Sequence, residues 1–105
     1  MFTGNEQHRI SLEEAAEYTA RYRTSHATDD IIGLYYSKTF LASVLAQEGC
    51  VGARVYFGES ADGEPQLILV GVDSDGNDLT GGIIGEYGQP CPPYCSEPHP
   101  LNSDE

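Results

Sequence analysis

The chain has 105 residues, of which 39% are hydrophobic, and a formal net charge of −12 at pH 7. This length predicts one domain, and no apolar run is long enough to span a membrane. The five basic residues are scattered among 17 acidic ones, whereas nucleic acid and anionic membrane surfaces require a clustered basic face. Both are therefore excluded as expected partners, and a basic protein surface suits this charge better. Because residues 1–9 show no apolar secretory segment, we expect a cytoplasmic location.

Residues 1–9 are polar and without periodicity, which predicts a flexible N-terminus. A helix is expected to begin after Ser11, because Ser is a good N-cap and Glu14 stands three residues later, as in a capping box. The apolar spacing that follows predicts that this helix runs from Leu12 to about Arg23 or Thr24.

Residues 24–30 form a polar connection in which Thr28 or Asp29 is expected to cap the next element. The short apolar run 31–36 is expected to form a helical turn. A second helix is predicted over about residues 38–47, because its apolar residues recur at helical spacing. Gly49 is expected to end this helix as its left-handed C′ residue.

Two β-rich runs, residues 50–58 and 66–73, are separated by a segment with Asp62, Gly63 and Pro65, which predicts a hairpin. The second run is apolar on both faces, which indicates a central strand or a face used for association. Residues 83–87 are expected to form a short third strand.

The predicted fold is therefore α+β, with two N-terminal helices packed on a three-stranded antiparallel meander. A single domain is expected over residues 10–88. The strongest helical stripe and the two hairpin strands predict its core residues, which are Val44, Leu45, Val55, Leu69 and Val70.

Residues 89–105 form a tail rich in Pro and Cys, in which Cys91 and Cys95 enclose Pro-Pro-Tyr and His99 follows. Three interpretations are open. The three side chains could bind zinc or copper, the two cysteines could form a disulfide, or they could stay free. We expect residues 89–95 to be ordered with Tyr94 packed, the chain beyond His99 to be loose, and residues 102–105 to be disordered.

Other segments carry weaker indications of chemistry. Residues 73–78 resemble the opening of a calcium loop, but the sixth and twelfth positions hold Asp78 and Ile84 where such loops have Gly and Glu. A turn is therefore the favoured interpretation. Cys50 is expected to be a small buried residue. No Ser-His-Asp or Cys-His arrangement is indicated, so we expect no catalytic residues, no cofactor and no enzyme activity.

Four strings carry a resemblance, namely 49–58, 69–73, 76–78 and the segment 91–95. Together they resemble small uncharacterised bacterial proteins in which two helices precede a Gly-Cys-Val-Gly strand motif and a Cys-Pro-Pro-Tyr-Cys tail follows. The resemblance supports the order of the elements and implies no activity or site residues.

Size, charge and tyrosine content favour a non-enzymatic acidic protein-interaction module, such as a regulator, an inhibitor-like or immunity-like protein, or an assembly subunit. Its expected partners are a basic protein and a second copy of the chain. The alternative is a metal-binding or redox protein that uses Cys91, Cys95 and His99 with zinc or copper.

Overall fold

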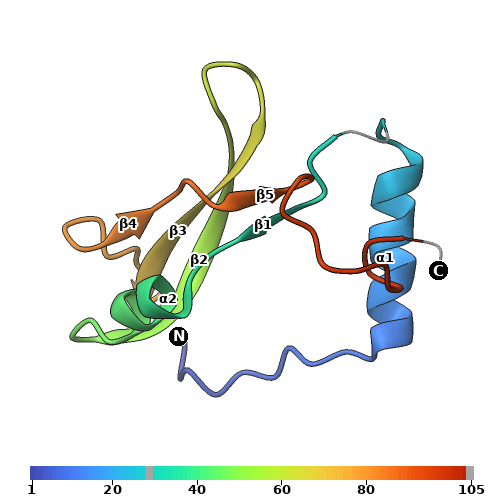
Figure 1. Ribbon diagram of the computed structural model, residues 1–105. Helices are drawn as coiled ribbons and strands as arrows, with labels where there is room; N and C mark the ends of the chain where they lie inside the picture. Colours follow the sequence, from blue (N-terminus) through green and yellow to red (C-terminus); the bar gives the residue numbers. More distant parts are fainter. Residues whose placement is uncertain (28–29, 104–105) are drawn as a thin grey trace. The chain divides into compact units, whose positions relative to one another are not determined.

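The computed structural model describes residues 1–27 and 30–103, and the chain divides into two compact units (Figure 1). The first unit consists of Met1–Gln7 and Tyr36–Gly88. The second consists of His8–Tyr35 and Gln89–Glu105. Each unit is therefore assembled from two segments that are far apart in the sequence.

A three-stranded antiparallel sheet dominates the first unit, with β2 (Cys50–Glu59), β3 (Pro65–Asp73) and β4 (Ile84–Gly85) in the order β2-β3-β4. The long hairpin of β2 and β3 is prominent in Figure 1. The expected hairpin is thus confirmed, and its doubly apolar second strand is the central one. A register shift between Cys50 and Gly52 marks a bulge at the start of β2.

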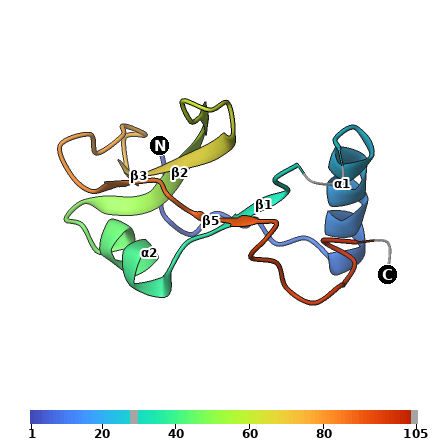
Figure 2. The ribbon, with the colours of Figure 1, turned by 45° about the horizontal axis from the view of Figure 1, so that its top comes forward.

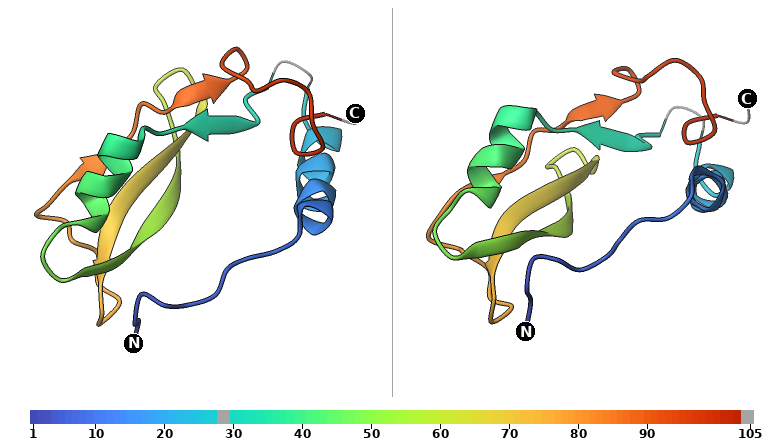
Figure 3. Two further views of the ribbon diagram at one scale, coloured as in Figure 1. Left: turned by 60° about the horizontal axis from the view of Figure 1, so that its bottom comes forward. Right: turned by 90° about the horizontal axis from the view of Figure 1, so that it is seen from below.

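Helix α2 (Lys38–Leu45) contacts β2 and β3 and covers one face of the hairpin (Figure 3). Its first turn is capped by Ser37, whose Oγ accepts a hydrogen bond from the Phe40 N–H at 3.1 Å. Phe40 lies against Gly85, where a Cβ atom would come within 1.9 Å of the aromatic ring, so this contact requires glycine. The helix ends earlier than expected, with its C-cap at Ala46. Gly49 has the expected positive φ of 79° but leads into β2 instead of standing at C′.

The core of the first unit is small. Among the described residues, the buried hydrophobic side chains are Val44, Leu69, Val70 and Val72. The prediction is confirmed for the first three. It is wrong for Leu45 and Val55, which are 52% and 46% exposed, because one ends a two-turn helix and the other lies on an edge strand.

The second unit contains α1 (Leu12–Thr24) and a two-stranded antiparallel sheet of β1 (Gly33–Tyr35) and β5 (Gln89–Cys91), which lie side by side in Figure 2. The predicted cap of α1 is confirmed, because the Glu14 N–H donates to Ser11 Oγ at 3.0 Å. Pro90 is compatible with β5 because a strand with one neighbour has an outward side on which no N–H is needed.

The predicted fold class is wrong in its packing. Helix α1 belongs to a different unit from the meander, so α2 alone packs on the three-stranded sheet, and a second sheet is present. The helical turn expected over 31–36 is also wrong, because β1 occupies its centre. A neighbouring strand supplied by β5 favours the extended form of this β-branched and aromatic run. The cap expected at Thr28 or Asp29 lies outside the described residues.

Both termini show specific contacts. The N-terminal ammonium and the Phe2 N–H donate to the Ser74 carbonyl at 2.7 and 2.8 Å within the first unit. In the second unit, the N–H groups of Asn102 and Ser103 donate to the His99 carbonyl at 3.0 Å. The disorder expected at 102–105 is thus not found at its first two residues, and residues 104 and 105 lie outside the described part.

Candidate functional site

The structure joins Cys91 and Cys95 by a disulfide, with their Cα atoms 4.7 Å apart. Strand β5 holds Cys91, whose carbonyl accepts the Ile32 N–H at 2.7 Å. The intervening residues form a turn, in which the Tyr94 N–H donates to the Pro90 carbonyl at 2.8 Å. Of the three open interpretations of the tail, the structure therefore has the disulfide. Sulfurs that are bonded to each other do not offer the thiolates that zinc or copper requires.

His99 lies with the two cysteines along one groove of about 320 Å³ in the second unit. The ring Nδ1 of His99 accepts the Leu101 N–H at 3.1 Å, and the backbone N–H of His99 donates to Asn102 Oδ1 at 2.9 Å. The structure thus brings the three predicted residues to one groove, but His99 takes part in a local turn. Among the described residues, no three His, Cys, Asp or Glu side chains are grouped so as to hold a metal ion. The expected packing of Tyr94 is wrong, since this side chain is 66% exposed.

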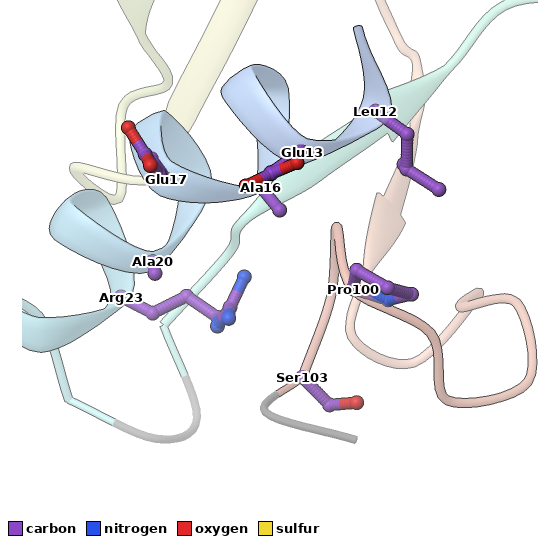
Figure 4. Close-up of a pocket in the computed structure, with 8 residues that line it drawn as sticks. All are labelled: Leu12, Glu13, Ala16, Glu17, Ala20, Arg23, Pro100 and Ser103. Atoms are coloured by element: carbon purple, nitrogen blue, oxygen red, sulfur yellow. The ribbon is translucent and has the colours of Figure 1, made fainter.

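A larger groove of about 720 Å³ runs along α1 in the same unit (Figure 4). Leu12, Ala16 and Ala20 form one wall because a spacing of four residues places them on one helix face. Glu13 and Glu17 add negative charge to this wall, and Pro100 and Ser103 form the other wall. The groove therefore combines apolar side chains with two carboxylates and the guanidinium of Arg23.

Arg23 ties the C-terminal segment to α1, because its Nη1 donates to the Leu101 carbonyl at 2.8 Å. Figure 4 shows this side chain extending from the helix toward the segment that carries Pro100. Sequence reasoning predicted the helix but not this groove, because no periodicity or motif links residues 100–103 to α1. The groove is an open surface lined by both apolar and charged side chains, which suits the binding of a partner.

A cluster of Arg54, Tyr56 and Asp78 lies on the first unit's sheet, on the face away from α2. Phe40 of α2 lies against Gly85, the partner of Leu69, whereas Arg54 pairs with the next residue of β3, which points to the other face. Arg54 Nη1 donates to Asp78 Oδ1 at 2.5 Å and to the Gly76 carbonyl at 3.2 Å, and the Tyr56 hydroxyl donates to Asp78 Oδ2. The hydrogen bond from Tyr56, followed by that from Arg54, lowers the pKa of Asp78 against the opposing effect of desolvation. The same bond to Asp78 is the main reason why the pKa of Tyr56 is raised.

This cluster explains why no calcium loop forms at residues 73–78. Asp78 is engaged by Arg54 and Tyr56, while Asp73 Oδ1 accepts the N–H groups of Asp75 and Asn77 at 2.9 and 3.0 Å. Gly76 has φ 85°, which is the left-handed conformation that favours glycine in a turn. The turn interpretation is confirmed.

Comparisons of the chain with protein-family models, curated proteins and solved structures gave no match. The resemblance to small bacterial proteins consequently stays a prediction. Neither helix in the described part of the chain has the length and apolarity that crossing a bilayer needs. A functional assignment must therefore rest on the chain's own charge and geometry.

Proposed function

We propose that this protein is a non-enzymatic acidic interaction module that binds a partner with a basic surface. The observation that supports this most directly is the balance of apolar side chains. Four hydrophobic residues are buried among the described residues, whereas sixteen large hydrophobic ones are exposed. Where such side chains gather on one surface, they mark a site of association.

The groove along α1 is the proposed contact surface. Leu12 is 56% exposed there, and Ala16 and Ala20 leave room for a side chain of the partner. Glu13 and Glu17 favour basic residues on either side of that contact. The chain as a whole, at −12, favours the same kind of partner through longer-range attraction.

Two further features belong to the same proposal. Self-association, expected from the doubly apolar second strand, would cover part of the exposed surface. A cytoplasmic location remains our expectation, although disulfides such as Cys91–Cys95 are commoner in oxidising compartments.

The metal or redox function stays the alternative, since reduction would return two thiolates to the groove that His99 lines.

Affinity capture with the immobilised chain tests the proposed function. Retained proteins are identified by mass spectrometry, purified and titrated individually with the full chain. We expect at least one basic protein whose affinity falls as salt is raised, since screening weakens contacts between opposite charges. Ala16→Arg, which fills the groove and offsets its negative charge, should weaken that binding at least about tenfold, equivalent to the loss of one buried contact.

Ala46→Arg is the matched control, because it makes the same change at an exposed position of the first unit. Binding that persists unchanged in Ala16→Arg would contradict the groove as the contact surface. If no basic protein is bound by the purified chain, the interaction function itself is wrong.

A further inference from the structure

Among the described strands β2 has one neighbour, since the sheet order is β2-β3-β4, and its other edge is unpaired there. Along this strand Ala53, Val55 and Phe57 are exposed, and they share one face of the sheet because they alternate in sequence. Phe57 is 92% exposed, which is the largest exposed fraction among the large hydrophobic side chains described. The edge is therefore apolar on one face over several residues.

Contacts on the far side of β3 show which way the β2 backbone points. The Leu67 carbonyl accepts the Tyr36 hydroxyl at 2.5 Å, and the Gly71 carbonyl accepts the Leu79 N–H at 2.8 Å. These residues of β3 thus direct their backbone groups away from β2. In an antiparallel ladder, the β2 residues opposite them therefore direct their own backbone groups away from β3.

The residues opposite Leu67, Leu69 and Gly71 are Phe57, Val55 and Ala53. Their N–H and C=O groups consequently point outward from the sheet. The pair Glu59 and Pro65, two positions closer to the hairpin loop, fits this alternation, because Pro65 has no N–H to donate to β2. At Ala53, Val55 and Phe57, apolar side chains and outward backbone groups thus coincide.

No described residue forms a hydrogen bond to the outward backbone groups of Ala53, Val55 or Phe57. Proteins usually protect such an edge with Lys, Pro, a bulge or a covering segment. The bulge of β2 lies before this stretch, between Cys50 and Gly52. The edge is therefore a template on which another strand can add.

Acidic side chains stand at both ends of this edge. Glu59, Asp62 and Glu64 lie at or next to the hairpin loop, where β2 ends. At the other end the N-terminal segment lies beside Val51, whose carbonyl would be 2.9 Å from a Cβ atom on Gly4. Glu6 accepts the Gly4 N–H at 3.0 Å, which places its carboxylate at this end.

We propose that the β2 edge from Ala53 to Glu59 binds an extended segment of another protein, with alternating apolar residues in its centre and basic residues at its ends. The segment would add a fourth strand, so that its backbone pairs with Val55 and Phe57 and its apolar side chains cover them. This inference rests on the proposed function and names a second contact surface for the basic partner.

A second copy of the chain fits the edge less well. Antiparallel pairing of two β2 strands would bring the acidic hairpin end of one copy toward the Glu6 end of the other. The positive charge on the strand does not offset this, because Arg54 is paired with Asp78. Charge therefore favours a basic segment over self-pairing.

The test uses the full chain and two labelled synthetic peptides, followed by fluorescence anisotropy. One peptide alternates valine and threonine over five residues and carries two lysines at each end. The other has glutamates in place of the lysines. We expect saturable binding of the lysine peptide that weakens with salt, and at least about tenfold weaker binding of the glutamate peptide.

Val55→Pro removes one outward N–H without removing a bond of the β2–β3 ladder, and should weaken binding of the lysine peptide about tenfold. Val55→Thr keeps the N–H and a similar shape, so its affinity should equal that of the parent chain. Phe57→Ser is the second variant. The Phe57 side chain is almost fully exposed, so this variant should keep the fold while its binding of the lysine peptide weakens.

Three outcomes would overturn the proposal. The first is no saturable binding of the lysine peptide up to about 1 mM, which corresponds to a binding free energy weaker than about −4 kcal/mol. The second is binding of the lysine peptide to Phe57→Ser as tight as to the parent chain. The third is a dimer in sedimentation that Phe57→Ser abolishes, which would identify a second copy at the edge. In each case, basic partners that still respond to Ala16→Arg would leave the proposed function standing.

Discussion

Arg54 donates a 2.5 Å hydrogen bond to Asp78 across the face of the central strand β3. Arg54 lies on β2 opposite Val70, whereas Asp78 forms an isolated bridge with Val72 on the other side of β3. The Arg54 side chain therefore crosses the strand between them. Val70 and Val72 are buried on the same face of the sheet as Arg54, because directly paired residues, and alternate residues of one strand, share a face.

Asp78→Asn should lower the urea midpoint of unfolding at neutral pH, because it removes the charge that Arg54 and Tyr56 bind. The pKa of Asp78 is lower in the folded state than its ordinary value of 3.8. Its stabilisation is therefore complete above pH 3.8 and is lost as pH falls through the lower folded-state pKa. Urea titrations from pH 7 to pH 2 should show the variant and the parent converging at the acid end.

Asp62→Asn is the control, because it removes one charge from the exposed hairpin loop and should leave the midpoint nearly unchanged. A difference between Asp78→Asn and the parent chain that stays constant down to pH 2 would contradict the role of the Asp78 charge.

Leu69→Ala should destabilise the first unit by about 2–5 kcal/mol, because it opens a cavity under α2 at a side chain that is 6% exposed. Leu45→Ala makes the same change at a side chain that is about half exposed, and should cost less than about 1 kcal/mol. Equilibrium urea unfolding of both variants measures the difference. Equal losses would mean that β3 is not the centre of the core.

Thiol counting tests the state of the tail. Cys50 is the free cysteine of the structure, and Cys91 and Cys95 are bonded to each other. Protein unfolded without reductant should therefore give one reactive thiol per chain, and reduced protein should give three. Three thiols without reductant would show that the disulfide is absent.

Metal analysis of the reduced protein completes this test. Stoichiometric zinc or copper retained after dialysis would support the alternative function, because reduction restores the two thiolates beside His99. Absence of metal together with one thiol in the oxidised protein would contradict the alternative.

The sequence by itself determined the local features of this protein. Ser11 and Ser37 begin the two helices, since a side-chain oxygen next to an apolar helical stripe acts within one turn. The alternation of residues 50–73 determined the hairpin, and Asp73, Gly76 and Asn77 determined the turn after it. Each of these signals lies within a few residues of the structure that it produces.

Only the tertiary structure decided which elements pack together. Nothing in the spacing of residues 31–36 shows that β5, more than fifty positions away, pairs with β1. The sequence likewise predicts only a turn at Asp78, and the hydrogen bond from Arg54 depends on the fold that places the two residues together. The exposure of Val55 follows from its place on an edge strand, because an apolar residue is buried only where the fold supplies a neighbour on its side. Partners of this kind are distant in sequence, so no local pattern carries them.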